Sequence, residues 1–192
     1  MISEIPTCDV MVDLETLGNK PGAAIISIGA VAQSDGGVET FKATISIASS
    51  IFVGLTVDPD TMSWWRKQSR EAWEASTEGG EPLAAVLEKF KTWLQERRAS
   101  GSGPTGTKLR LWGDSASFDL VLLGCAYRAA GLPTPWEYWE EHCYRTLRNV
   151  LGSKKPRAKL QHDSLSDAAA QLSHLKQMLK TLEYASLPTR AA

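Results

Sequence analysis

The fold is decided by residues 8–16, CDVMVDLET. The run from Cys8 to Asp13 is rich in Val and Met, which predicts a short buried β-strand. Side chains at positions i and i+2 of a strand point to the same face, so Asp13 and Glu15 project together while Leu14 turns into the core. Two adjacent carboxylates repel each other, and a hard divalent cation commonly satisfies them. By itself, however, a D-x-E pair is more often a solvated strand end.

The rest of the chain alternates predicted strands and helices. Runs 25–32 and 39–47 are predicted strands separated by a Ser-Asp-Gly-Gly turn at 34–37, which gives a three-stranded meander, and 109–112 is a fourth short strand. Helical spacing with Gly and Pro stops predicts helices at 59–73, 82–94, 118–130, 144–151 and 164–184. This order indicates an α/β fold with a mixed sheet flanked by helices.

Length and composition favour a single domain in a reducing compartment. The 192 residues bury enough surface for a core without a disulfide or zinc staple. Lys and Arg number 21 against 22 Asp and Glu, so any case for nucleic-acid binding has to come from local patches. The three cysteines are odd in number and lack C-x-x-C spacing, which argues against a disulfide framework and a Cys-only zinc site.

One domain is predicted over residues 1–192, with a core at about 9–182, a flexible loop at 99–107 (ASGSGPTGT) and a tail at 185–192. The first basic residue is Lys20, so a basic leader region is missing. The longest apolar run, 22–32, has 11 residues, whereas roughly 20 are needed to span a bilayer. We therefore expect a cytoplasmic protein without a membrane partner.

Two further acidic motifs precede predicted helices. In WGDSASFD (112–119), Asp119 falls in the first helical turn, where the helix dipole favours its charge. In HDSLSD (162–167), His162 must lie in the loop before the helix if it is to converge with Asp167, because a five-residue step along one helix rotates by about 140°. Taken singly, both motifs are explained at least as well by ordinary helix-starting acids and an exposed histidine.

The three motifs in order are D-x-E on the first strand, an acid after a mid-chain strand, and H-x4-D at the start of the last helix. This set resembles the DEDD group of 3′–5′ exonucleases in the ribonuclease H-like superfamily, and H-x4-D points to the histidine subtype. More closely, MVDLETLGNKP (11–21) looks like the opening of small phage and prophage exodeoxyribonuclease VIII-like proteins. The match extends through ISIGA (26–30), WW (64–65), WG (112–113) and the 135–146 region.

The resemblance implies a five-stranded mixed sheet with helices on both faces. It also implies that four carboxylates hold two Mg²⁺ or Mn²⁺ ions, namely those of Asp13, Glu15, Asp119 and Asp167. Two such ions about 4 Å apart neutralise the charge that develops on the oxygens during phosphodiester hydrolysis. His162 would be the general base that takes a proton from the attacking water.

Basic residues near these motifs are candidate phosphate contacts. Between His142 and His162 stand six Lys or Arg residues and no acid, and Arg145 lies in the region that carries the resemblance. A polyanion can approach a group of carboxylates only if metals and nearby cations offset them. Two positions depart from the pattern of relatives: Asp114 replaces a frequent Asn, and Cys143 replaces a frequent Asp.

Aromatic and first-motif residues complete the predicted substrate contacts. Trp64 and Trp65 are about 100° apart on a predicted helix, and Trp65 shares a face with the apolar side chain three residues earlier. Trp65 is therefore expected in the core and Trp64 to be freer to stack on a base, although core packing of both is the alternative. By resemblance, Thr16 and Leu17 lie against the terminal nucleotide.

The predicted activity is a metal-dependent 3′–5′ exonuclease acting on single-stranded DNA ends. The alternatives are a 3′–5′ exoribonuclease of the same fold, a non-catalytic nucleic-acid-binding module and a structural cation site. A site discriminates between DNA and RNA by excluding or contacting the 2′-hydroxyl, so both substrates stay open at this point. Relatives are often dimeric, so a homodimer is a further expectation. If the protein is phage-encoded, the expected location is the cytoplasm of a bacterial host.

Overall fold

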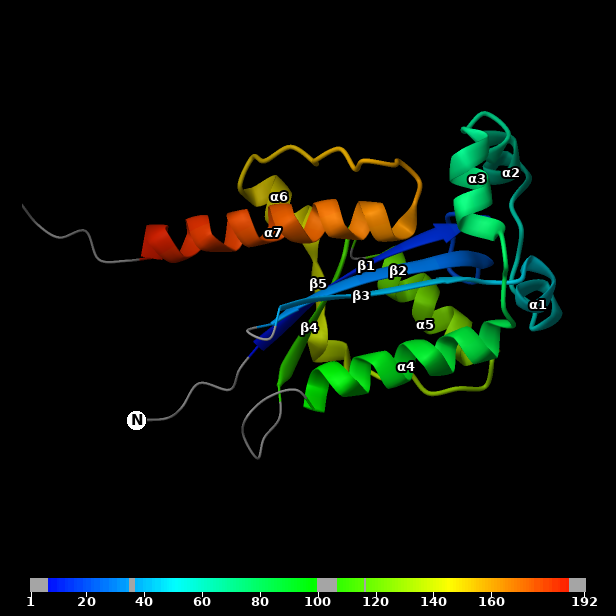
Figure 1. Ribbon diagram of the computed structural model, residues 1–192, viewed down its shortest axis with the longest axis horizontal. Coiled ribbons are helices and arrows are strands. Elements are labelled where there is room, and N and C mark those ends of the chain that lie inside the picture. Colours follow the sequence, from blue (N-terminus) through cyan, green and yellow to red (C-terminus); the bar gives the residue numbers. More distant parts are fainter. Residues whose placement is uncertain (1–6, 35–36, 100–106, 116, 187–192) are drawn as a thin grey trace, which may run out of the picture.

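The chain is built on a mixed sheet whose strand order is β3–β2–β1–β4–β5 (Figure 1). The structure, a computed structural model, describes residues 7–34, 37–99, 107–115 and 117–186. The strands are β1 (Thr7–Thr16), β2 (Ile25–Ser34), β3 (Gly37–Thr44), β4 (Lys108–Gly113) and β5 (Glu141–Cys143). β1, β2 and β3 form the predicted antiparallel meander, β4 runs parallel to β1, and β5 runs parallel to β4. The predicted five-stranded mixed sheet is confirmed.

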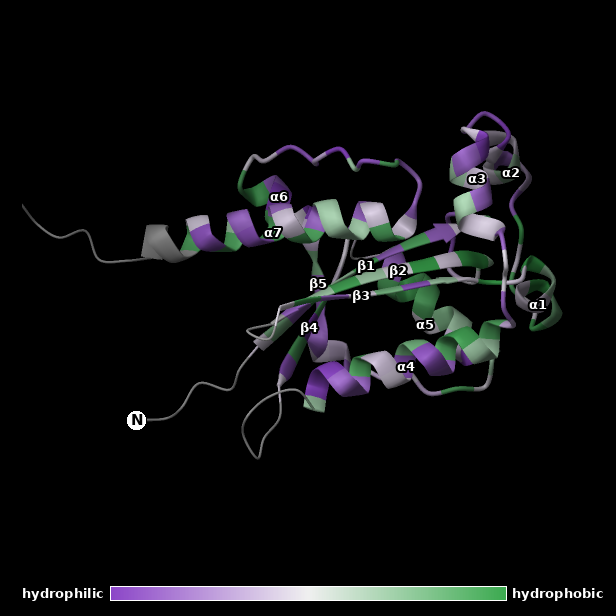
Figure 2. Cartoon of the chain, in the orientation of Figure 1, coloured by the Kyte–Doolittle hydropathy of each residue, from purple (hydrophilic) through white to green (hydrophobic). Residues whose placement is uncertain are grey.

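Helices cover both faces of this sheet (Figure 1). α4 (Leu83–Ala99) and α5 (Asp119–Ala129) pack on one face, and α6 (Tyr144–Val150) and α7 (Ser164–Ser186) pack on the other. Figure 2 shows mostly hydrophobic residues in the central strands β1 and β2, between these two layers. Three short helices gather at one end of the sheet: α1 (Ile47–Phe52), α2 (Pro59–Trp65) and α3 (Arg70–Thr77). Among the helices of the described segments, none is both long enough and apolar enough to cross a membrane.

β1 is buried on both faces, and its alternation decides which side chains reach the site. Val10, Val12 and Leu14 pack into the larger hydrophobic core with residues of α4 and α5. Met11 packs into the smaller core with residues of α6 and α7. Because strand side chains alternate, the face of Met11 continues through Asp13 at the end of the strand. The first acidic motif therefore faces α7.

Gly29 on β2 lets α7 lie directly on the sheet. Gly29 is the register partner of Asp13 on β1. A Cβ atom at this position would lie 2.2 Å from the backbone carbonyl carbon of Ser164, the first residue of α7, so a side chain would push the helix away. The Ser27 hydroxyl forms a 2.7 Å hydrogen bond with the Ser164 hydroxyl. Together these contacts place the start of α7 beside the end of β1.

The structure corrects two predicted elements and locates the fifth strand. The strand expected at 39–47 ends at Thr44, because Ser46 begins helix α1 by accepting a hydrogen bond from the Ser49 N–H. The single helical stretch expected at 59–73 is two helices, because Ser69 caps α3 in the same way. β5 was implied only by the resemblance, since three residues are too few for a periodic pattern.

The predicted loop and tail fall largely outside the described residues. Of the loop at 99–107, positions 100–106 are not described. The tail was expected from 185, but α7 continues to Ser186, and residues 187–192 are not described. The assignment of residues 1–192 to one domain stays a prediction.

Candidate active site

A cavity of about 340 Å³ opens where β1 and β4 end. Crevices at the carboxyl ends of strands are the usual ligand sites of α/β sheets. Leu17 is buried in the larger core with 1% of its surface exposed and is not among the residues that line the cavity, and its contact with the nucleotide stays a prediction. The other predicted site residues all line it: Asp13, Glu15, Thr16, Trp64, Trp65, Asp119, Arg145, His162 and Asp167.

Three carboxylates converge in this cavity. Asp13 and Glu15 leave the same face of β1, and Asp167 comes from the first turn of α7. One oxygen of each carboxylate lies within 4.8 Å of the oxygens of the other two. Asp163 fixes this turn of α7, because its carboxylate accepts a hydrogen bond from the Ser166 N–H at 2.9 Å. The first and third sequence motifs therefore meet as expected.

Asp119 faces the same cavity from the first turn of α5 and is 2% exposed. Its two carboxylate oxygens accept hydrogen bonds from the backbone N–H groups of Leu14 at 3.3 Å and Asp114 at 2.8 Å. Gly113 leaves room for it, since a Cβ there would lie 3.1 Å from the Asp119 side chain. Asp119 thus stands beside the three-carboxylate cluster, and each of its oxygens keeps a second lone pair for a ligand.

The carboxylates have raised pKa values because they are withdrawn from water and repel one another. Burial, followed by the charges of Asp119, Glu15 and Asp167, raises the pKa of Asp13 well above its usual range. Burial, followed by the charge of Asp167, raises the pKa of Glu15 to about 8. Burial also raises the pKa of Asp119 to about 6, against its backbone hydrogen bonds. The positive charge beside the cluster does not offset its carboxylates, and their all-oxygen donor set fits Mg²⁺ or Mn²⁺.

His162 lies in the loop directly before α7, the placement predicted for convergence with Asp167. Its backbone is in the left-handed region, with φ of 61°, and its N–H donates a 3.0 Å hydrogen bond to the Asp167 carboxylate. The imidazole contacts the Trp64 ring edge to face, with 4.7 Å between the ring centroids. The chain reversal at His162 therefore lets one short segment supply both a carboxylate and an imidazole to the cavity.

The two neighbouring tryptophans lie as predicted. Trp65 is 3% exposed, packs in the larger core and donates from its indole N–H to the Thr16 carbonyl oxygen at 2.9 Å. Trp64 is 40% exposed at the cavity. This exposed ring presents a surface on which a base can stack, while Trp65 supports the end of β1.

Comparison with known proteins agrees with this geometry. The family model described as the 3′–5′ exoribonuclease Rv2179c-like domain matches residues 8–179. The chain belongs to the Rv2179c-like family. The matched segment contains all three acidic motifs and every residue that lines the cavity. The description of this family agrees with the predicted class of enzyme, a 3′–5′ exonuclease.

Among solved structures, the crystal structure of cell-death related nuclease 4 (CRN-4) is similar, with a TM-score of 0.58 and 11% sequence identity. The match covers 91% of the Rv2179c-like chain but 64% of CRN-4, so the chain spans about two thirds of this neighbour, and the likeness shows a shared fold. No curated protein gives a significant match. Closeness to the exodeoxyribonuclease VIII-like proteins stays a prediction.

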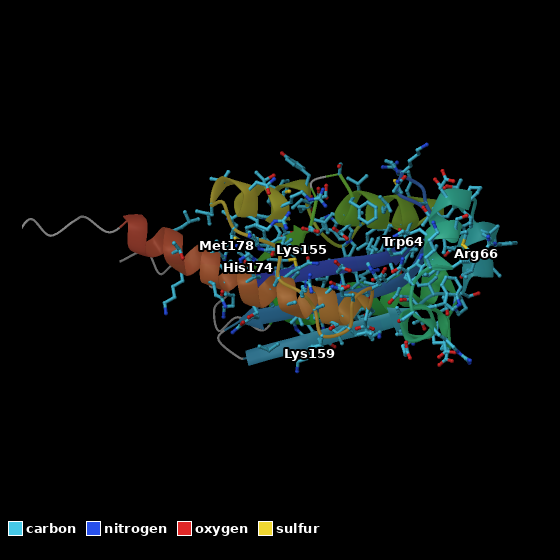
Figure 3. All side chains as sticks on the ribbon, turned by 90° about the horizontal axis from the view of Figure 1, so that it is seen from above. Trp64, Arg66, Lys155, Lys159, His174 and Met178 are labelled. Carbon is cyan, nitrogen blue, oxygen red and sulfur yellow. The ribbon has the colours of Figure 1, made fainter. Side chains whose placement is uncertain are left out.

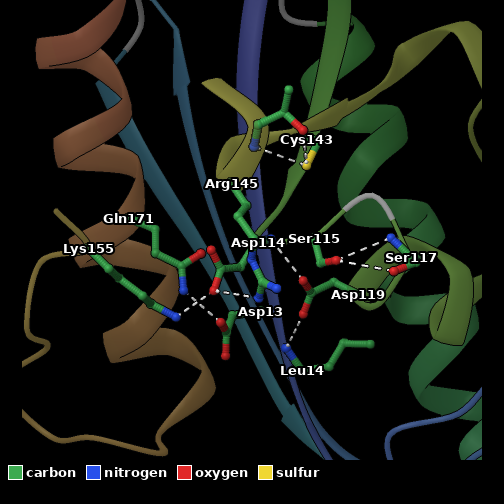
Figure 4. A network of polar contacts seen from close by, with 11 residues as sticks. Asp13, Leu14, Asp114, Ser115, Ser117, Asp119, Cys143, Arg145, Lys155 and Gln171 are labelled. Atoms are coloured by element: carbon green, nitrogen blue, oxygen red, sulfur yellow. Dashed lines mark hydrogen bonds and ion pairs between the residues drawn. The ribbon is translucent and has the colours of Figure 1, made fainter. Parts of the chain in front are cut away.

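Two further residues contact the Rv2179c-like site (Figure 4): Gln171 was not singled out from the sequence, whereas Lys155 is one of the six basic residues that were candidate phosphate contacts. Gln171 is 1% exposed, and its side-chain amide donates to Asp13 at 2.7 Å. Its spacing could have revealed it, because Gln171 follows Asp167 by four residues on one helix face. Lys155 lines the cavity and donates to the Asp114 carboxylate at 2.7 Å. That contact joins residues 41 positions apart and leaves no local pattern.

Proposed function

We propose that this chain is a divalent-metal-dependent 3′–5′ exonuclease for single-stranded nucleic acid, formed by one domain with its core at about 9–182. The observation that carries the proposal is the convergence of Asp13, Glu15 and Asp167 within 4.8 Å. Asp119 and His162 line the same cavity. A structural cation site explains the carboxylates but gives no role to a partly exposed imidazole beside them.

The proposed metal ligands are the carboxylates of Asp13, Glu15, Asp119 and Asp167. Two Mg²⁺ or Mn²⁺ ions bound there would lower the pKa of a bound water and neutralise charge on the phosphoryl oxygens. His162 accepts the proton of the attacking water as the general base. The new bond joins the water oxygen to phosphorus, and the bond to the 3′-oxygen breaks. The products are a nucleoside 5′-monophosphate and a strand shortened by one nucleotide.

The proposed substrate contacts lie around the mouth of the cavity. Trp64 stacks on the terminal base, and its contact with His162 keeps base and imidazole next to each other. Trp65 and Thr16 form the wall behind it, joined by the indole hydrogen bond. Arg145 contacts a phosphate of the strand. A homodimer and a cytoplasmic location stay predictions from the sequence.

RNA is the substrate that we propose first, because the matching family is described as an exoribonuclease. Single-stranded DNA is the second candidate, on the resemblance of residues 11–21 to exodeoxyribonuclease VIII-like proteins. The two differ by the 2′-hydroxyl at each nucleotide and by the methyl group of thymine, so one cavity can be tested with matched strands.

The test is a gel assay with 5′-labelled RNA and DNA of the same sequence, in Mg²⁺, in Mn²⁺ and in EDTA. The proposal expects a ladder that shortens from the 3′ end with metal only, and faster on RNA. Faster shortening of DNA would support the second candidate. The variant His162→Ala should bind metal and strand but lose roughly 10²- to 10⁴-fold in rate. No cleavage of either strand, with metal binding shown by calorimetry, would overturn the nuclease assignment in favour of a structural cation site.

A further inference from the structure

Asp114, directly after β4, connects the carboxylate cluster to the basic segment that precedes α7 (Figure 4). Its backbone N–H donates to the Asp119 carboxylate at 2.8 Å. Its side-chain oxygen Oδ2 accepts a 2.7 Å hydrogen bond from the Lys155 ammonium group and lies 3.6 Å from the Arg145 guanidinium. Only 14% of the Asp114 side chain is exposed, so it is an interior link between these groups.

Lys155 is held inside the cavity by this contact. It belongs to the segment between α6 and α7 and lies beside α7 when the molecule is seen from above (Figure 3). Burial acts to lower its pKa, but the hydrogen bond to Asp114 and the charges of Asp114, Asp13 and Asp167 outweigh burial and raise the pKa. The ammonium group is therefore positive at neutral pH. With 39% of its side chain exposed, Lys155 also stays accessible to a ligand entering from solvent.

The charge around the cavity explains why such a cation is needed. The carboxylates that line it are those of Asp13, Glu15, Asp114, Asp119 and Asp167. Among the described lining residues, the Lys and Arg charges are those of Arg145 and Lys155. A nucleic-acid backbone brings one negative charge per phosphate, so it needs positive groups on the wall that it passes. An ammonium group has three N–H donors, and the bond to Asp114 uses one of them.

We infer that Asp114 is a positioning residue that holds Lys155 on the cavity wall, where the ammonium group binds a backbone phosphate of the single-stranded substrate. The inference rests on the proposed function and specifies which cation of the basic segment reaches the strand. It also gives a role to the Asp that departs from the frequent Asn of relatives, because a carboxylate attracts the ammonium group more strongly than an amide does.

The first experiment compares Lys155→Met with Lys154→Met. Both variants remove one positive charge from the same segment, but Lys154 is not among the residues that line the cavity. Binding of a fluorescent single-stranded RNA is followed by anisotropy with Ca²⁺ as the metal. Lys155→Met should weaken binding about 10-fold, as for loss of a hydrogen bond to a charged group, whereas Lys154→Met should change it less than about 2-fold. Equal effects would mean that Lys155 acts through general charge, which overturns the inference.

The second experiment uses Asp114→Asn, for which the two explanations predict opposite signs. Removing a negative charge from the cavity tightens polyanion binding if only net charge matters. If Asp114 positions Lys155, binding instead weakens about 2- to 5-fold, and KM rises while kcat changes less. In the Lys155→Met background, Asp114→Asn should cause no further weakening. Tighter binding, or additive losses in the double variant, would overturn the positioning role.

Folding and activity controls separate this inference from the proposed function. Thermal unfolding of each variant shows whether a loss of binding reflects a loss of structure. If the unchanged protein cleaves RNA but Lys155→Met binds it normally, the inference fails and the proposed function stands. If the unchanged protein cleaves neither RNA nor DNA while Lys155→Met still weakens binding selectively, the nuclease proposal fails and Lys155 remains a nucleic-acid contact.

Discussion

Two positions of β1, Asp9 near its start and Asp13 in its second half, carry the same residue type in opposite situations. Asp9 accepts two hydrogen bonds of 2.7 Å from the guanidinium of Arg110, its register partner on β4, and one of 2.8 Å from the indole N–H of Trp112. Asp13, four residues later on the same face, accepts one from Gln171 and otherwise meets the carboxylates of the site.

This difference shows how one strand combines a structural and a functional task. At Asp9 the protein supplies the compensating charge, and the ion pair ties β1 to β4. At Asp13 the hydrogen-bond donor is the neutral amide of Gln171, and burial together with the neighbouring carboxylates raises the pKa of Asp13. A carboxylate that the fold leaves uncompensated is suited to a cation from solution. Four predictions test the contrast, in order of expected effect.

Asp13→Asn should have the largest effect on activity. It should lower turnover and at the same time raise the thermal stability of the metal-free protein. Loss of this proposed metal ligand would remove several kcal/mol of transition-state stabilisation, so turnover should fall by about 10³-fold or more. In EDTA, however, the variant should melt at a higher temperature than the unchanged protein, because one of several repelling charges is gone. Both are measured by the gel assay and by thermal unfolding. Retained activity and Mn²⁺ affinity would contradict the role of Asp13.

Asp9→Asn is the matched substitution near the start of the strand. It should lower the free energy of unfolding by about 1–2 kcal/mol, because Arg110 loses a charged partner while the indole hydrogen bond can persist. Metal affinity and kcat should stay unchanged, since Asp9 does not line the cavity. Denaturant titration and calorimetry measure these effects. A drop in metal affinity would show that the two positions are not independent.

Gln171→Met should weaken metal binding while the fold persists. The Gln171 amide fixes one oxygen of Asp13, and losing such a partner of a metal ligand typically costs 10- to 100-fold in affinity. We expect the dissociation constant for Mn²⁺ to rise about 10-fold, as measured by calorimetry. Gln177→Met, on the same helix but outside the cavity, is the control. An unchanged dissociation constant would mean that Asp13 is positioned by its strand alone.

Without metal, the free energy of unfolding should fall by about 1 kcal/mol or more as the pH rises from about 6.5 to about 8. Burial raises the pKa of Glu15 to about 8, so the folded chain keeps a proton that the unfolded chain has already lost. This stabilisation is present at the lower pH and disappears as the pH reaches the folded pKa. The window avoids lower pH because burial lowers the pKa of His174, which acts in the opposite direction. Denaturant titrations in EDTA and in Mn²⁺ measure the slope, which metal should flatten.

Much of the fold follows from local pattern. The meander and β4 are predictable because apolar alternation and turn residues act over a few positions. The break between α2 and α3 depends on one capping serine, Ser69, and β5 gains its strand character from pairing with β4, so neither has a clear periodic signal. Cys143 caps the start of α6, because its sulfur accepts a hydrogen bond from the Thr146 N–H at 3.4 Å. An Asp, which is frequent at this position in relatives, could cap the helix in the same way.

The site residues also fall into two groups, those placed by local sequence pattern and those placed by contacts between distant parts of the chain. Asp13, Glu15, Asp119, His162 and Asp167 stand at strand ends and helix starts, so their directions follow from the backbone. Lys155 reaches the cavity through a side-chain contact with Asp114 across 41 positions, which spacing cannot encode. Leu17 was expected at the nucleotide because it adjoins the first motif, but the chain turns it into the core beyond Thr16.

The seat that Gly29 provides for α7 makes the site a product of complete folding. Asp13 and Gln171 are 158 positions apart, and they meet only after α7 has docked on β2. A chain that has formed its sheet but not yet seated this helix lacks Asp167, His162 and Gln171 at the cavity. Long-range contacts of this kind form late. Under the proposed function, molecules in which α7 has not docked would therefore not hydrolyse nucleic acid, and the activity would depend on the complete fold.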